Sequence, residues 1–209
     1  MKFLFSLLLG LILPFSSAFA QEGSSDANSP DAMVKGVTEE VLSIVRQDAD
    51  IQSGNTGKAI ALVEAKVLPH FDFQRMTALA MGRDWNKADP EQKKRLTDEF
   101  QTLLVRTYSN ALTGYKDQTV RYKPANQPAG DGDTVVKTEI LQSGGRPIQL
   151  DYSVEKTPDG WKVYDVIVAG VSLVTNYRDA FTQQVRANGV DGLIKMLSDK
   201  NRQLESETK

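Results

Sequence analysis

The chain has 209 residues with no cysteine, and its 25 Lys and Arg residues nearly balance 27 Asp and Glu residues. The lack of cysteine excludes disulfides, thiol catalysis and zinc–thiolate sites. The mildly acidic balance argues against nucleic acid as a partner, because binding to a phosphate backbone requires a clustered positive field.

The N-terminus has the organisation of a secretory signal peptide. Lys2 supplies the positive charge, an apolar run extends from Phe3 to Leu13, and Ala18-Phe19-Ala20 is typical of a signal peptidase site. The apolar run is shorter than the ~20 residues needed to span a bilayer. We therefore expect residues 1–20 to be removed and the mature protein to be located in the periplasm.

The mature chain is expected to form one α+β domain over residues 31–209. Residues 21–30 before it are small, polar and aperiodic, which is typical of a flexible tail. Apolar residues then recur at helical spacing, and this spacing predicts helices over 31–50, 58–68, 72–80 and from Asp89 to about Gly114.

The start of the last of these helices carries the strongest local signal in the chain. Asp89 can cap the helix, Pro90 suits its first position, and Gln92 can complete a capping box. We therefore expect the long helix to begin at this point.

After Gly114 the period of the apolar residues changes from 3.6 to 2, which indicates strands. We expect four antiparallel strands at 119–123, 133–142, 148–155 and 161–168, followed by helices over 172–189 and 191–199. In the third strand apolar and polar residues alternate cleanly, which predicts one dry face and one wet face.

No set of catalytic residues is evident. His70 is the single histidine and has no nucleophile or metal partner nearby in sequence, so we interpret it as structural or exposed. Asp165 could act as a base, because strict alternation places it on the face of Trp161, Val163 and Ile167, where burial raises a carboxyl pKa. The interpretation that we favour is a β-bulge or a sheet edge that lets Asp165 reach solvent. No phosphate-binding or metal motif occurs, and no cofactor or metal is expected.

Positive charges gather before and along the helix that Asp89 opens. They are Arg83, Lys87, Lys93, Lys94 and Arg106. Such charges form either a solvated helix face or a surface that meets an acidic partner or a phosphate head group, and both interpretations stay open.

Seven short segments, spread in order over nearly all of residues 31–200, form a recognisable pattern. They are Met81–Trp85, Pro90–Gln92, Phe100–Tyr108, Gly145–Pro147, Trp161–Val166, Gly170–Val174 and Gly189–Leu193. Together they resemble the toluene-tolerance (MlaC) family of periplasmic proteins.

The resemblance implies a fold like that of nuclear transport factor 2, in which a curved sheet and N- and C-terminal helices enclose an apolar cavity. It implies a periplasmic phospholipid carrier that shuttles lipid between the outer and inner membranes and maintains the lipid asymmetry of the outer membrane. The implied partners are a phospholipid ligand, an inner-membrane ATP-driven (ABC) lipid transporter complex and an outer-membrane lipoprotein–porin complex. This family is not known for catalysis. A periplasmic enzyme with Asp165 as base is therefore the second hypothesis, and an envelope interaction protein without ligand is the third.

Strand alternation and the inward stripe of the long helix predict which side chains line such a cavity. They are Leu104, Tyr108, Val136, Ile140, Ile148, Leu150, Tyr152, Val166, Val168 and Val171.

We predict that the mature protein begins at Gln21 and is recovered from the periplasm, because the small residues at 18 and 20 follow a short apolar core. Mass spectrometry of the purified protein checks the N-terminus. An uncleaved, membrane-bound chain would contradict the prediction.

Overall fold

The computed structural model describes residues 28–123 and 132–207. The predicted signal peptide and residues 21–27 of the predicted tail therefore lie outside the described residues. Ser29 caps the first helix by accepting a hydrogen bond from the Ala32 amide at 3.1 Å, and Pro30 is already helical.

Helices precede and follow a single sheet. The first group comprises α1 (Pro30–Gln47), α2 (Ala49–Gln52), α3 (Thr56–Lys66), η1 (Leu68–His70), α4 (Phe73–Met81), η2 (Gly82–Lys87), α5 (Pro90–Tyr108) and η3 (Ser109–Leu112). The sheet comprises β1 (Thr119–Tyr122), β2 (Thr134–Leu141), β3 (Ile148–Thr157), β4 (Gly160–Val168) and β5 (Val171–Ser172). The chain then forms α6 (Leu173–Asn176) and α7 (Arg178–Glu207), which breaks at Gly189, where φ is 72°.

The sheet is an antiparallel meander with strand order β1-β2-β3-β4-β5. The four predicted strands are confirmed, and the two-residue strand β5 was not predicted. The capping box at the start of α5 is also confirmed. The Gln92 amide donates to Asp89 Oδ1 at 2.8 Å, and the Asp89 amide donates to Gln92 Oε1 at 3.1 Å.

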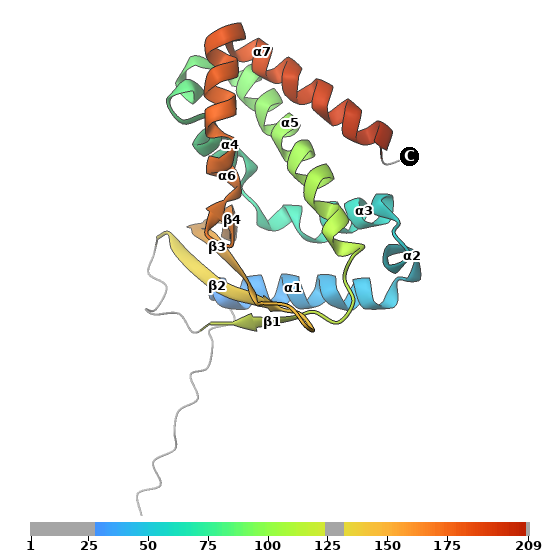
Figure 1. Ribbon diagram of the computed structural model, residues 1–209. Coiled ribbons are helices and arrows are strands. Elements are labelled where there is room, and N and C mark those ends of the chain that lie inside the picture. Colours follow the sequence, from blue (N-terminus) through green and yellow to red (C-terminus); the bar gives the residue numbers. More distant parts are fainter. Residues whose placement is uncertain (1–27, 124–131, 208–209) are drawn as a thin grey trace, which may run out of the picture.

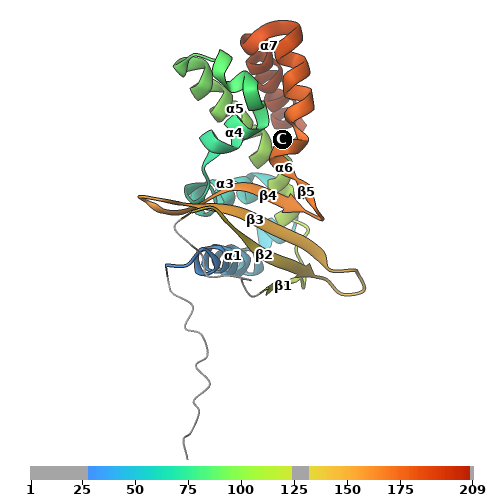
Figure 2. The same cartoon turned by 90° about the vertical axis from the view of Figure 1, so that its left-hand side faces the viewer.

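The sheet lies between two groups of helices (Figures 1 and 2). On one face, Val34 of α1 packs with Val136, Val154 and Val163. We call this the α1 face. On the other face, Arg75 of α4 reaches Glu155 of β3, so we call it the α4 face. The largest hydrophobic cluster joins α4, α5, α6 and α7 around residues such as Phe100.

A β-bulge in β4 decides which side chains share a face. Ser153 of β3 pairs with Asp165, but the next residue, Val154, pairs with Val163, so Tyr164 is an extra residue in β4. Because of this extra residue, the alternation of β4 reverses at Tyr164. Val163 and Val166 therefore both lie on the α1 face, while Asp165 lies on the α4 face.

Arg75 ties α4 to the sheet. Its guanidinium binds Asp133 at 2.5 Å and Glu155 at 2.5 Å, and it stacks 3.6 Å above the ring centre of Tyr164. The guanidinium lowers the pKa of the Asp133 carboxyl below its usual range by hydrogen bonding to it. Sequence analysis placed Arg75 on a helix but had no signal for these partners, which are distant in sequence.

Arg75→Met is expected to lower the free energy of unfolding by about 1–2 kcal/mol, through loss of two partly exposed ion pairs and one cation–π contact. The stabilisation that comes from the ion pair with Asp133 is fully present above pH 3.8, the ordinary pKa of the carboxyl group. It is lost as the pH falls through the lowered pKa that Asp133 has in the folded protein. Urea unfolding of both proteins at about pH 7 and about pH 3 measures this.

Arg121→Met is the matched control, because Arg121 is 59% exposed and pairs with Glu139 at 3.4 Å. An equal loss of stability in both variants would contradict a special role for Arg75.

Candidate functional site

Six apolar side chains on the α1 face lie outside the hydrophobic clusters of the described core. Five of them are half-buried, and the sixth, Val171, is 56% exposed. We call this set the apolar strip. Its members are Val120, Ile140, Ile148, Leu150, Val168 and Val171.

The strand register makes the apolar strip continuous across the sheet. Ile140 stands opposite both Val120 and Ile148. Val168 stands opposite both Leu150 and Val171. Directly opposed residues have Cβ atoms about 4.5–5.5 Å apart, so their side chains are in contact. The strip is therefore one apolar surface at the end of the sheet that carries the β2–β3 turn.

The helix α1 covers only the other end of the same face. Met33 and Val34 pack there with Val136, Val154 and Trp161. Farther along α1, Val41 and Val45 instead pack with α2 and α3. The strip thus differs from the rest of the face in its partial exposure, and continuous exposed apolar surface of this kind marks a binding site for an apolar ligand or partner.

Eight of the ten predicted lining residues lie together on the α1 face. Ile140, Ile148, Leu150, Val168 and Val171 belong to the apolar strip, and Val136, Tyr152 and Val166 belong to the part packed beside α1. The other two lie elsewhere. Leu104 is buried in the cluster of α4–α7, and Tyr108 is 41% exposed at the end of α5. Sequence analysis missed Val120, although the alternation in β1 could have indicated it.

Asp165 has a structural role in the fold. The β-bulge that we expected is confirmed, but the expected exposure to solvent is wrong, because Asp165 is only 9% exposed. Its carboxylate accepts hydrogen bonds from the Ser172 hydroxyl at 2.6 Å and from the Val174 amide at 3.2 Å. It therefore holds the start of α6 against β4 on the α4 face. No observation favours its action as a base on the α1 face.

His70 lies half-buried in η1. Burial lowers the pKa of its imidazole, and the nearby charge of Lys162 lowers it further. Lys162 is itself held there, because its ammonium group donates to the Pro69 carbonyl at 2.6 Å. The imidazole is consequently neutral near pH 7, which agrees with its interpretation as a structural residue.

The predicted basic residues divide between two places. Arg83, Lys87, Lys93 and Lys94 gather at η2 and the start of α5, whereas Arg106 is 13 residues beyond Lys93. That separation is about 20 Å along a helix. Three of the five charges have acidic neighbours: Lys87 pairs with Asp84 at 2.6 Å, Lys94 with Asp98 at 2.5 Å and Arg106 with Glu205 at 3.5 Å. Lys93 lies 5.4 Å from the ring centre of Trp85.

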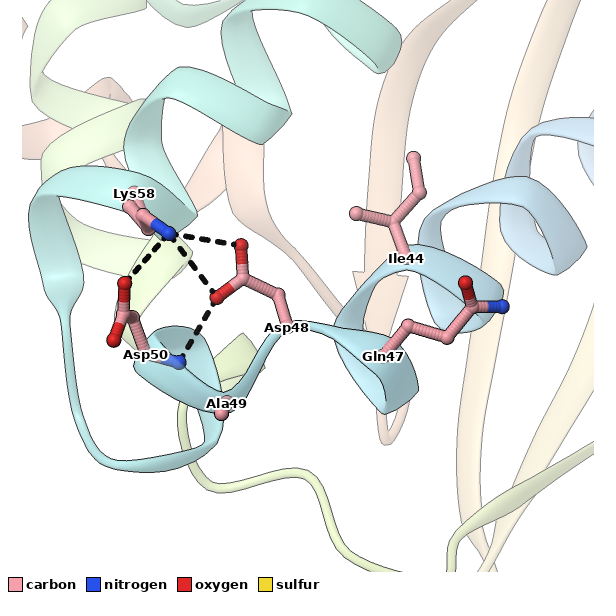
Figure 3. Close-up of a pocket in the computed structure, with 6 residues that line it drawn as sticks. All are labelled: Ile44, Gln47, Asp48, Ala49, Asp50 and Lys58. Carbon is pink, nitrogen blue, oxygen red and sulfur yellow. Dashed lines mark hydrogen bonds and ion pairs between the residues drawn. The ribbon is translucent and has the colours of Figure 1, made fainter.

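A separate surface hollow of about 460 Å³ lies at the junction of α1, α2 and α3 (Figure 3). Its charges are satisfied internally. Lys58 bridges Asp50 at 2.6 Å and Asp48 at 3.3 Å, and Asp48 also caps α2 by accepting from the Asp50 and Ile51 amides. These contacts lower the pKa of Asp48 and raise that of Lys58. The hollow is lined by charged groups as well as by Ile44 and Ala49, so it differs from the wholly apolar strip.

Two further kinds of feature are absent from the described residues. Among residues 28–123 and 132–207, no helix combines the length and apolarity needed to cross a bilayer. Over the same two ranges, no group of three or more His, Cys, Asp or Glu side chains is placed to hold a metal ion.

Comparison with known proteins now assigns the chain. The sequence pattern of the MlaC protein family matches residues 35–199. The chain belongs to the MlaC family. Toluene tolerance protein ttg2D from Pseudomonas putida is 28% identical over 167 residues, which cover 79% of this chain and 77% of that protein. The intermembrane phospholipid transport system binding protein MlaC from Haemophilus influenzae is 23% identical over 170 residues, which cover 79% of each chain.

A solved structure supports both the family and the fold. It is the phospholipid-binding protein from Ralstonia solanacearum in complex with a phospholipid. It is 42% identical in sequence, has a TM-score of 0.78, and the match covers 87% of this MlaC-family chain and 99% of that one. The predicted family and the predicted α+β fold class with an antiparallel sheet are therefore confirmed.

Proposed function

We propose that this chain is a soluble periplasmic carrier that holds the acyl chains of a phospholipid on the apolar strip and shuttles lipid between the outer and inner membranes. The observation that carries the proposal is the partial cover of the α1 face. Leu150 and Val168 are only half-buried, although they continue the apolar face that α1 buries at Val136 and Val154. The 42% identical relative that was solved with a phospholipid supports the choice of ligand.

The energetics suit reversible exchange. Removing about 30 methylene groups from water contributes roughly 25 kcal/mol at ~0.8 kcal/mol each. In a bilayer these chains are already out of water, so moving them from the membrane to an apolar protein surface changes the free energy little. Such a protein removes the cost of crossing the aqueous space but gives the movement no direction.

Direction must therefore come from partners. We propose an inner-membrane ATP-driven lipid transporter complex at one end of the route and an outer-membrane lipoprotein–porin complex at the other. Lipid asymmetry of the outer membrane would be the result of this transfer. The relative named as a binding protein of an intermembrane phospholipid transport system supports this assignment.

Replacing Leu150 with Asp is expected to reduce co-purified phospholipid roughly tenfold or more, because the new carboxylate loses water when acyl chains cover it. The half-burial of Leu150 keeps that carboxylate hydrated in the lipid-free protein, so the fold should survive. Denaturing extraction followed by mass spectrometry measures the bound lipid, and circular dichroism checks the fold.

Val135→Asp is the matched control. Val135 is 42% exposed and, on the neighbouring strand β2, lies on the α4 face. It should retain the lipid of the natural chain. A folded Leu150→Asp protein with full lipid content, or wild-type protein without any phospholipid, would count against the proposed function.

We also propose that the basic residues at the start of α5 guide docking rather than lipid binding. Reversing the charges of Lys93 and Lys94 to Glu should leave co-purified lipid unchanged and slow transfer to vesicles that carry the inner-membrane partner. Exposed charges act mainly on encounter rates, so the dependence of transfer on salt should also flatten, with screening over ~10 Å at 0.1 M.

The control reverses Lys35 and Lys66, which are 56% and 42% exposed and pair with Glu39 and Glu40. They lie on α1 and α3 and are therefore outside η2 and α5, which carry the basic residues under test. If both double variants transfer lipid at the wild-type rate across a salt series, the basic residues are a solvated helix face.

A further inference from the structure

One polar group on the α1 face lacks a partner. The side chain of Tyr122, on the edge strand β1, points to the α1 face opposite Thr138. Its hydroxyl oxygen is fully buried, and no donor or acceptor lies in hydrogen-bond geometry with it in the described protein. A buried hydroxyl without a partner costs free energy, so its retention requires a reason.

The hydroxyl groups around Tyr122 are already engaged or differently placed. The Thr38 hydroxyl of α1 donates to the Val34 carbonyl at 2.7 Å, and the Thr138 hydroxyl donates to the Leu150 carbonyl at 2.5 Å. The Thr38 hydroxyl is close enough to lower the pKa of both Tyr122 and Tyr152 as a hydrogen-bonding neighbour, but it is not in hydrogen-bond geometry with the Tyr122 hydroxyl in this conformation. Among the described residues, no acceptor is therefore placed in good geometry for the proton of Tyr122.

The position of Tyr122 relates this proton to the apolar strip. Across the sheet, Tyr122 is in the same row as Thr138, Leu150 and Val168. Val120, two residues away on the same strand and the same face, belongs to the strip itself. Tyr122 thus lies on the edge strand where the apolar strip meets the part of the α1 face that α1 covers.

The charges around Tyr122 favour a neutral acceptor. Burial raises the pKa of its phenol, so the group is a protonated donor near neutral pH. The carboxylate of Glu39 lies near enough to raise that pKa further, and its negative charge would repel an anionic phosphate. An ester carbonyl is neutral, accepts one such hydrogen bond, and joins the acyl chains of a phospholipid to its polar part.

We propose that the Tyr122 hydroxyl donates a hydrogen bond to an ester carbonyl of the bound phospholipid, so that the site distinguishes diacyl lipids from ether-linked lipids. This inference rests on the proposed function. It adds a residue that recognises the linkage to a surface that otherwise recognises only apolar chains.

The test uses the delipidated mature protein and two short-chain phosphatidylethanolamines with equal chain length, one diacyl and one dialkyl ether. Wild-type protein should bind the diacyl lipid roughly two- to tenfold more tightly, which is the range of one neutral hydrogen bond. Tyr122→Phe should weaken diacyl binding by the same factor, leave ether-lipid binding unchanged, and so abolish the preference.

Unfolding of the lipid-free proteins provides an independent readout. Because the hydroxyl has no partner there, Tyr122→Phe should leave stability unchanged or slightly raised. Tyr164→Phe is the matched control. It removes the hydroxyl that lies 3.3 Å from Asp133, on the α4 face, and should keep the wild-type preference for the diacyl lipid.

The outcomes separate the two proposals. If neither lipid binds the wild-type protein, the proposed function fails and the assignment of Tyr122 fails with it. If both lipids bind the wild-type protein equally, the assignment fails alone. Destabilisation of the lipid-free protein by Tyr122→Phe would also overturn it, since the hydroxyl would then serve the fold.

Discussion

The extra residue in β4 is the constraint on which the two sides of the sheet depend. Without the bulge at Tyr164, strict alternation would place the carboxylate of Asp165 on the same face as Val163, in the part of the sheet that α1 buries. A carboxylate there would need a partner or would lose its charge. With the bulge, Asp165 instead accepts hydrogen bonds from Ser172 and Val174, while Tyr164 lies beneath Arg75. One inserted residue thus keeps the α1 face apolar and attaches the helical layer to the opposite face.

The α1 face is only partly covered because α1 packs against two different parts of the protein. This helix has 18 residues, which correspond to about 27 Å at 1.5 Å per residue. Val34, near its start, packs on the sheet, whereas Val41 and Val45 pack with Ile51 and Ala59 of α2 and α3. The second half of the helix therefore cannot also cover the end of the sheet that carries Ile140 and Ile148. The apolar strip stays partly exposed because the second half of α1 packs against α2 and α3 and not against the sheet.

Local sequence patterns predicted the helices and strands well, but they could not predict contacts between residues that are distant in sequence. The capping box at Asp89, the hairpin strands and the break at Gly189 all depend on residues within a few positions of each other, so spacing alone indicates them. Alternation also placed eight lining residues on one face, because register follows from the hairpin turns. It could not show that Leu104 is buried among α4–α7, since a stripe on α5 does not reveal whether α7 or the sheet covers it. Arg75 and Tyr122 illustrate the same limit. Their roles depend on partners, or on the lack of partners, that only the folded chain defines.

The division of the hydrophobic residues explains how a stable protein can keep an incompletely covered surface. The largest cluster, with Phe100, Phe181 and Leu197, lies among α4–α7, where Phe100 meets Phe181 edge to face at 5.2 Å. The apolar strip contributes nothing to that cluster, so an acyl chain could leave or enter the strip without repacking the main core. Polar and apolar contacts together connect the two regions: Arg75 reaches Glu155, Asp165 holds the start of α6, and Phe71 packs against both clusters. The packed helical layer therefore stabilises the fold while the sheet face stays partly open, and the proposed exchange of lipid depends on this combination.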